Sequence, residues 1–90
     1  MTTPRTDYPH SRHSSKRLIR WLAQAEIQRR AYWEEYKQAS DAPSYLYAYS
    51  KCLYWANFGW ECCAVLTARG FSKAVLDDII EKADGWARIR

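Results

Sequence analysis

The sequence is poor in the residues that end strands and build tight turns. It contains three glycines and three prolines, and no segment alternates apolar and polar residues in the manner of an exposed strand. It also lacks any run of 18 apolar residues and any apolar segment behind the first methionine, so neither a membrane span nor a secretory signal is expected. We therefore expect an all-α protein of the cytoplasm that has no contact with membranes.

Cysteine and histidine are also scarce. The three cysteines are odd in number, form no C-x-x-C pair and include two neighbours, Cys62 and Cys63. Both histidines fall within the first 13 residues, far along the chain from these thiols. This distribution predicts free, buried thiols and neither a disulfide framework nor a zinc site. Because no Gly-rich phosphate loop and no nucleophile beside a base are visible, we predict no catalytic residue, no metal and no cofactor.

Positive charge is concentrated near one end of the chain. Residues 1–30 hold seven Lys or Arg and two acids, whereas residues 31–90 hold seven Lys or Arg and eight acids. We predict that residues 1–13 are a flexible basic arm and that residues 14–90 are a single helical domain. The arm and the first helical turns are a candidate contact for nucleic acid or another anion. The residues concerned are Arg5, Arg12, Lys16, Arg17 and Arg20. The alternative is that the arm only keeps the chain soluble.

The remainder of the sequence predicts three helices. Apolar residues recur at helical spacing over about 15–39, 43–69 and 72–84. A residue that can cap the N-terminus precedes each of them, namely Ser14 or Ser15, Asp41 and Ser72. The short link between the two long helices predicts an antiparallel hairpin. The shorter third helix is expected to return along the second and so to complete a three-helix bundle.

The second predicted helix is apolar almost all round, so more than one of its sides should be covered. Small residues at spacings of three and four form one face, which we expect to pack against the first helix: Ala48, Cys52, Ala56, Gly59 and Cys63. A third helix of about 13 residues spans only about 20 Å, so it cannot reach the turn of the hairpin. The region near that turn, here called the hairpin tip, should therefore expose aromatic side chains.

The hairpin tip is the predicted interaction surface. Tyrosine and tryptophan are enriched in binding hot spots, and monomers rarely expose so large an apolar patch. Seven residues form the predicted protein interface: Trp33, Tyr36, Tyr45, Tyr47, Tyr49, Tyr54 and Trp55. We expect this surface to bind either a second copy of the chain or a different protein. The alternatives are that segment 86–90 folds over the tip and covers it, or that several of the rings only lie along the surface with their hydroxyl groups in water.

One charged residue interrupts the apolar stripe of the first predicted helix. Arg29 falls near the middle of that stripe. A buried guanidinium without a partner is very unfavourable. We therefore expect a salt bridge from Arg29 to Glu61 or to another acid. The alternatives are that its side chain extends to solvent or reaches into a partner.

The stretch 68–80 resembles a bacterial helix-turn-helix. Gly70, the apolar residue after it, Ser72 as a cap, and apolar Leu76 and Ile79 occupy the positions that this motif favours. The resemblance, which extends over about 64–83, implies a second helix that would enter the major groove of DNA. The positions that would face the groove hold acidic residues: Asp77, Asp78 and Glu81. We therefore interpret the stretch as an ordinary tight turn between helices.

These patterns favour a small non-catalytic protein that acts stoichiometrically as a regulator, adaptor or inhibitor of another protein. Its size and its aromatic contact face resemble those of the small proteins that phages and mobile elements direct against host machinery. The alternative function is association with nucleic acid through the basic arm.

Overall fold

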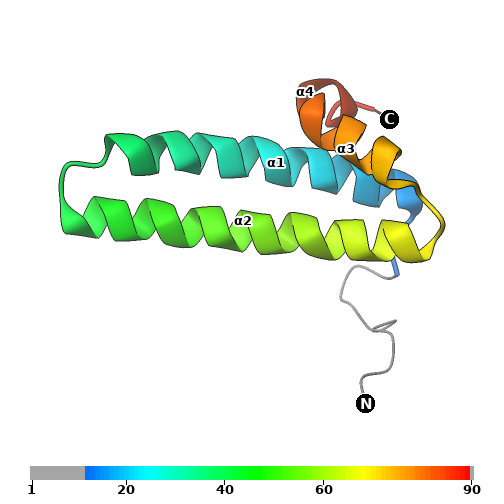
Figure 1. The fold of residues 1–90 in the computed structure, drawn as a ribbon, viewed down its shortest axis with the longest axis horizontal. Helices are drawn as coiled ribbons and strands as arrows, with labels where there is room; N and C mark the ends of the chain where they lie inside the picture. Colours follow the sequence, from blue (N-terminus) through cyan, green and yellow to red (C-terminus); the bar gives the residue numbers. More distant parts are fainter. Residues whose placement is uncertain (1–11, 90) are drawn as a thin grey trace, which may run out of the picture.

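The computed structural model describes residues 12–89 as four helices and their connections (Figure 1). The helices are α1, Ser15–Gln38; α2, Ala42–Ala68; α3, Lys73–Glu81; and α4, Ala83–Trp86. The prediction of an all-α protein is confirmed for the described residues, and each end of the two long helices lies within one residue of its predicted position. Residues 1–11 of the predicted arm, including Arg5, lie outside the described residues.

Each of the three longer helices begins at a capping side chain. The cap accepts a hydrogen bond from the backbone N–H three residues further on: Ser14 at 3.1 Å, Asp41 at 2.8 Å and Ser72 at 3.3 Å. Such a bond satisfies one of the N–H groups that the first helical turn leaves without an intrahelical acceptor. The helix starts are therefore set by local side-chain chemistry that is readable in the sequence.

Gly70 ends α2. Its φ of 97° lies in the left-handed region, where a side chain would be strained. The Gly70 N–H donates to the Thr67 carbonyl (3.0 Å), and the Phe71 N–H donates to the Leu66 carbonyl (3.1 Å). This pair of bonds is the Schellman pattern of helix termination. The chain therefore turns sharply from α2 toward α3.

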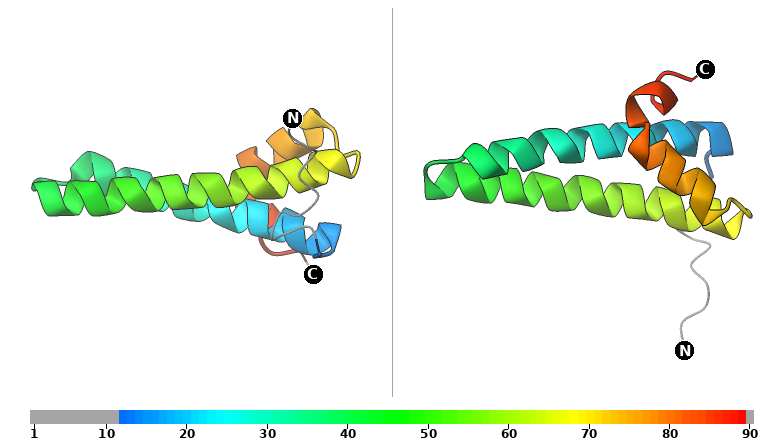
Figure 2. Two further views of the ribbon diagram at one scale, coloured as in Figure 1. Left: turned by 90° about the horizontal axis from the view of Figure 1, so that it is seen from below. Right: turned by 45° about the horizontal axis from the view of Figure 1, so that its top comes forward.

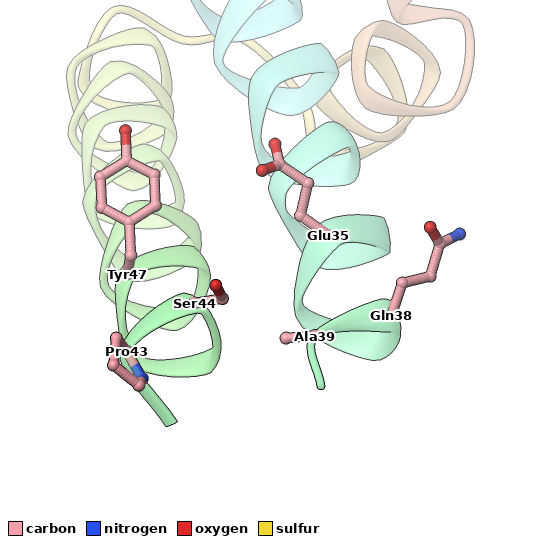
Figure 3. A pocket seen from close by; sticks show the side chains of 6 residues that line it. All are labelled: Glu35, Gln38, Ala39, Pro43, Ser44 and Tyr47. Carbon is pink, nitrogen blue, oxygen red and sulfur yellow. The ribbon is translucent and has the colours of Figure 1, made fainter. Parts of the chain in front are cut away.

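The two long helices form an antiparallel hairpin along the longest dimension of the molecule (Figures 1 and 2). At the closed end, Ala39 at the end of α1 lies close to Ser44 at the start of α2 (Figure 3). At the open end, the Arg69 guanidinium donates to the Ser15 hydroxyl (3.1 Å) and to the His13 carbonyl (2.7 Å). These two bonds tie the start of α1 to the end of α2.

The C-terminal helices differ from the prediction of one helix that returns along α2. The helix breaks at Lys82 into α3 and α4. α3 crosses the open end of the hairpin, and α4 packs against α1 (Figure 2). The Trp86 indole N–H donates to the Asp78 carboxylate (2.9 Å) and so fastens α4 to α3. Because this segment lies at the open end, the alternative in which it covers the hairpin tip is wrong.

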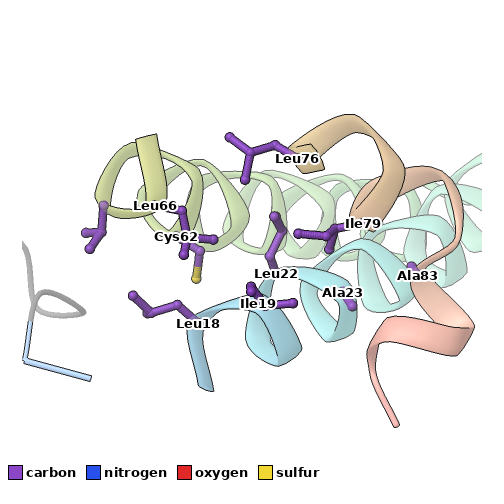
Figure 4. Close-up of a cluster of buried hydrophobic side chains, with 10 residues drawn as sticks. Leu18, Ile19, Leu22, Ala23, Cys62, Leu66, Leu76, Ile79 and Ala83 are labelled. Carbon is purple, nitrogen blue, oxygen red and sulfur yellow. The ribbon is translucent and has the colours of Figure 1, made fainter. Parts of the chain in front are cut away.

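The hydrophobic core is confined to the open end of the hairpin (Figure 4). Its buried residues come from all four helices: Leu18, Ile19, Leu22, Ala23, Cys62, Val65, Leu66, Leu76, Ile79 and Ala83. Trp86, Ala87 and Ile89 fold back and pack against this cluster. We call residues 26–58 the distal half of the hairpin. Its only buried residues are Ala48 and Cys52, so it has almost no core of its own.

The small-residue face of α2 meets α1 in a slightly different register from the predicted one. Ala48, Cys52 and Gly59 are buried as expected, but Ala56 is exposed, and Cys63 is only half-buried. A neighbouring residue, Cys62, is fully buried instead. The reason is geometric, because two helices that pack along their length meet at positions that alternate by three and four residues.

α1 approaches α2 closely at Gly59. A Cβ atom at this position would lie 3.5 Å from Leu22 Cδ1 and 3.6 Å from Ala25 Cβ, which is ordinary van der Waals contact. The close packing expected at this glycine is therefore present. It nevertheless leaves enough room for a methyl group.

Candidate protein-binding surface

The predicted interface residues all lie in the distal half of the hairpin. Five of the seven are exposed: Trp33, Tyr45, Tyr47, Tyr49 and Tyr54. The other two, Tyr36 and Trp55, are half-buried. Their ring contacts divide them into two groups, one around the closed end and one along a side of the hairpin.

The first group, which we call the tip cluster, consists of Trp33, Tyr36, Tyr45 and Tyr49. The Trp33 ring stacks on Tyr36 with 5.0 Å between centroids and 17° between planes. Tyr45 and Tyr49 approach the Tyr36 ring from α2, with centroids at 4.6 Å and 5.7 Å. The Tyr36 and Tyr45 hydroxyls form a hydrogen bond (2.9 Å), which raises the pKa of Tyr36. These contacts join the two helices near the turn while three of the rings stay exposed.

The second group, which we call the lateral row, runs along the hairpin from the tip toward the open end. It consists of Tyr32, Tyr47, Tyr54, Trp55, Phe58 and Trp21. Tyr32 meets Tyr47 edge-on at 6.1 Å. The Lys51 ammonium lies 5.7 Å from the centre of the Tyr47 ring and 5.9 Å from that of Tyr54. The remaining rings follow one another at 5.0 Å, 5.5 Å and 5.8 Å. The lateral row is thus a track of aromatic rings in which the Lys51 ammonium bridges Tyr47 and Tyr54.

A third set of exposed residues was missed by the sequence prediction. Leu46, Leu53 and Trp60 follow one another on α2 at intervals of seven residues and are 60 %, 47 % and 62 % exposed. Three further residues of α2 complete an alternation of three and four: Tyr49, Ala56 and Cys63. We call these six residues the outer seam. The alternation itself is the signal that could have revealed them, because helices that pack side by side meet at such positions.

α2 carries little charge for a helix with so much exposed surface. Lys51 and Glu61 are its only charged residues in 27 positions. One side of α2 packs against α1, and apolar side chains also occupy both flanks of that side, in the lateral row and in the outer seam. None of the helices within residues 12–89 has the length and apolar character that crossing a membrane requires.

A groove of about 240 Å³ lies beside the outer seam, between the long helices. Its lining comes from α2 (Trp55, Ala56, Gly59, Trp60 and Cys63), from α1 (Leu22, Glu26 and Arg29) and from α3 (Ile80). Small side chains alternate here with two indole rings. The groove can therefore accept an apolar side chain from outside.

The charges that line this groove neutralise one another. The Glu26 carboxylate accepts hydrogen bonds from Arg29 (2.9 Å and 2.7 Å) and from Arg30 (2.7 Å). Burial alone would raise the pKa of Glu26, but the two guanidinium groups outweigh it and hold that pKa below its usual range. The predicted salt bridge of Arg29 is therefore confirmed, and its acid is Glu26 on the same helix.

A wider hollow of about 440 Å³ opens between the two helix ends at the tip (Figure 3). It is lined from α1 by Glu35, Gln38 and Ala39, and from α2 by Pro43, Ser44 and Tyr47. Tyr47 also belongs to the lateral row. The hollow thus extends that track of aromatic surface to the turn of the hairpin.

The predicted basic contact lies at the open end, far from the tip cluster. Arg12, Lys16 and Arg17 are exposed, and Arg20 is partly exposed. The first turn of α1 contains no acidic residue. The Arg17 guanidinium lies 6.0 Å from the centre of the Trp21 ring. Four of the five predicted cations are therefore gathered near the start of α1, and the fifth lies outside the described residues.

Two of the three acidic residues of the helix-turn-helix resemblance take part in surface ion pairs. Asp77 pairs with Lys73 (2.7 Å), and Asp78 pairs with Lys82 (3.2 Å). The helix before the turn has 27 residues, far more than the first helix of that motif. These features agree with the interpretation of this stretch as an ordinary connection between helices.

The three cysteines are free thiols, as predicted. Burial raises the pKa of Cys62 to about 12 and also raises the pKa values of Cys52 and Cys63. Thiolate, the nucleophilic form, is therefore scarce at neutral pH. Within residues 12–89, no three His, Cys, Asp or Glu side chains gather so as to hold a metal ion.

The tip cluster, the lateral row and the outer seam together are the candidate binding surface, which occupies the distal half of the hairpin and extends beyond it toward the open end at Trp21, Trp60 and Cys63. Their residues come from both long helices, and only a few of them are fixed by packing beneath. The chain matches no protein-family model, and comparison with the curated proteins and with the solved structures finds no significant match.

Proposed function

We propose that this protein is a non-catalytic interaction module that acts stoichiometrically on another protein, as a regulator, adaptor or inhibitor, through the distal half of its hairpin. The separation of the core from the aromatic surface is the observation that carries the proposal. The core occupies the open end. Residues 26–58 hold two buried residues, yet they contribute seven of the nine large apolar side chains that are exposed within residues 12–89.

This separation matters because exposed rings contribute little to folding. An aromatic side chain can bury about 150–250 Å². At about 25 cal/mol per Å², a half-exposed ring leaves about 2–3 kcal/mol of transfer free energy that only a covering partner can gain. A partner that covers several of these rings gains enough to offset the loss of freedom on association. The distal half therefore has the energetic properties of a binding surface.

The proposal is tested by capturing partners from the native cell with the tagged chain. Tyr47 and Tyr54 flank Lys51 in the lateral row and are both more than half exposed, so their removal should leave the core intact. We expect Tyr47→Ala with Tyr54→Ala to weaken binding to the captured protein by about tenfold or more, measured by calorimetry with the purified partner.

The matched control is Val75→Ala, which alters an exposed apolar residue of α3 at the open end. It should bind as the wild type does, and circular dichroism should show unchanged helix content in every variant. Equal affinity of the double variant and the wild type would refute a role for the lateral row. If Val75→Ala weakens binding to the captured partner as much as the double variant does, the interface is not confined to the distal half.

A second candidate function is association with nucleic acid through the basic contact. It is supported by the exposure of Arg12, Lys16 and Arg17 and by the absence of an acid from the first turn of α1. Cations at a helix N-terminus oppose the helix dipole, so an anionic partner would give their placement a use. Arg17→Ala with Arg20→Ala should then weaken binding to duplex DNA and reduce its salt dependence. Binding to DNA that neither the variant nor added salt changes would exclude this function.

We place this activity in the cytoplasm. The three free thiols support that location, because a reducing compartment keeps cysteines in this state. Fractionation of the native cell, followed by detection of the chain with an antibody, is the direct test. Recovery of the chain with three oxidised cysteines from an extracellular fraction would refute the assignment.

A further inference from the structure

The outer seam, together with the tip cluster beside it, has a pattern that points to one kind of partner. We propose that it binds a second copy of this chain, in antiparallel orientation and with Leu53 at the two-fold axis, so that two hairpins form a four-helix assembly. This inference rests on the proposed function and specifies the partner for one side of the binding surface. The lateral row, on the other flank of α2, is left for a different protein.

The spacing of the seam supports a helix as its partner. Leu46, Tyr49, Leu53, Ala56, Trp60 and Cys63 alternate by three and four residues, the positions at which one helix meets another over a long stretch. The side of α2 that faces α1 shows the same alternation, at Ala48, Cys52, Gly59, Cys62 and Leu66. A helix with two apolar seams packs between two neighbours. α1 is the first neighbour, and the seam fits a second.

The side chains along the seam are complementary in size to those of a second seam that runs in the opposite direction. If two seams run antiparallel about Leu53, Leu46 of each copy lies opposite Trp60 of the other, and Tyr49 lies next to Ala56. Large side chains then meet smaller ones, which gives dense packing. A parallel pair would instead set Trp60 against Trp60 and leave a gap between two Ala56 residues. Self-complementarity of this kind is what a symmetric dimer requires, and a different protein would not require it.

The charges along the chain favour the same orientation. No charged residue lies on the seam itself, and the two charged residues of the groove beside it, Glu26 and Arg29, are paired with each other, so the two copies meet without burying an unpaired charge. The exposed cations at the open end, Arg12, Lys16 and Arg17, would lie side by side in a parallel pair. In the antiparallel pair they lie at opposite ends of the assembly, where their repulsion is screened.

The available area is sufficient for a stable pair. Six large side chains on this side of the hairpin are each between 43 % and 62 % exposed: Trp33, Tyr45, Leu46, Tyr49, Leu53 and Trp60. At about 200 Å² for each side chain, they offer on the order of 600 Å² per copy and 1,200 Å² per pair. Interfaces of specific complexes begin at about 1,200 Å². The pair is therefore at the lower end of the usual range, and its dissociation should be measurable by dilution.

Sedimentation equilibrium of the full chain tests the proposal directly. We expect the mass of a dimer at high concentration and of a monomer after dilution. Leu53→Glu places two carboxylates at the axis and should give the mass of a monomer at every concentration. Tyr54→Glu introduces the same charge at the next residue, which is also exposed but lies off the seam, and should leave the dimer intact. Circular dichroism of both variants checks that the hairpin is folded.

Disulfide formation tests the orientation. In the antiparallel pair, a Leu53→Cys thiol meets its own copy and should form a covalent dimer on mild oxidation. Leu46→Cys should not, because the two copies of residue 46 would be about 20 Å apart along the helices, far beyond disulfide reach. The wild-type chain, treated identically, controls for its three native thiols. Equal dimer formation by both variants would indicate a parallel pair and refute the register.

The failure of this inference differs from the failure of the proposed function. A wild-type chain that stays monomeric at all concentrations refutes the second copy as the partner. If that monomer still loses a captured protein through Leu53→Glu, a different protein occupies the seam. If it loses a captured protein only through Tyr47→Ala with Tyr54→Ala, the proposed function stands and the seam has no role in it.

Discussion

One substitution made at two positions of α2 measures how unevenly stability is distributed along the hairpin. Leu66 is fully buried in the core at the open end, whereas Leu46 is 60 % exposed near the tip. Leu66→Ala removes three buried carbon atoms and leaves a cavity, so it should reduce the free energy of unfolding by about 2–5 kcal/mol. Leu46→Ala should reduce it by about 0.5 kcal/mol or less, because Leu and Ala have similar helix propensities and little packing is lost.

The assay is urea unfolding followed by circular dichroism in dilute solution. A chain of this length has a total stability of about 5–13 kcal/mol, so Leu66→Ala removes a large fraction of it. For a domain of this size it should also lower the melting temperature by on the order of 10 °C or more. A loss at Leu46 as large as the loss at Leu66 would refute the reasoning, because it would mean that the distal half is packed. If a second copy covers Leu46, the loss of stability caused by Leu46→Ala should be larger when the measurement is repeated at high protein concentration.

Three further predictions concern local features. Gly59→Ala should raise the free energy of unfolding in urea by up to about 1 kcal/mol, because the added methyl fits beside α1 and alanine favours the helix. Gly70→Ala should lower it by about 1–2 kcal/mol, because alanine is strained at a positive φ. Changes of the opposite sign would contradict both assignments. The pKa of Glu26 in the folded protein is held below its ordinary value of 4.5. The wild type should therefore be more stable than Glu26→Gln, with the full difference present above about pH 5 and lost as the pH falls through the lowered pKa. A stability difference that grows on acidification would contradict this sign. Burial raises the pKa of Cys62 to about 12, so Cys62 should react with iodoacetamide only after unfolding, whereas half-buried Cys63 should react earlier. Peptide mass spectrometry measures the two rates, and equal rates would place Cys62 outside the core.

The helices could be predicted from local chemistry alone. Ser14, Asp41 and Ser72 each accept the backbone bond that their position before an apolar run suggests, and Gly70 adopts the left-handed turn that ends α2. These features depend on a few neighbouring residues, so the sequence carries them completely. The short link between the two long helices similarly predicts an antiparallel hairpin.

The course of α3 and α4 could not be predicted in the same way. The sequence indicates that Ile79 and Ala83 belong to an apolar stripe, but it does not say which long helix the stripe meets. That choice depends on tertiary contacts, such as the hydrogen bond that the Arg30 guanidinium of α1 donates to the Ile80 carbonyl (2.6 Å), which tie the segment to α1. The break at Lys82 has no Gly or Pro to mark it.

The candidate surface was predicted in part, for a related reason. Most of the exposed aromatic residues stood out by type, so Tyr47 and Tyr54 were identified without knowledge of their neighbours, whereas Trp60 was missed. Leu46 and Leu53 were missed because a leucine in an apolar helix is usually core. Only the burial pattern separates them from Leu66, which has the same side chain on the same helix. Their seven-residue interval was visible in the sequence, but it acquires meaning once α1 is known to occupy the other seam.

The location of the core at the open end also has a kinetic consequence. The bonds from Arg69 to His13 and Ser15 join residues more than 50 positions apart, and the core joins the start of α1 to the end of α2. The hairpin therefore cannot gain its stability by zipping from the turn. The chain must first close a loop of about 40 residues, which costs about 2 kcal/mol more than closing one of four. We expect this protein to fold more slowly than its helical content suggests, with the turn free to form late.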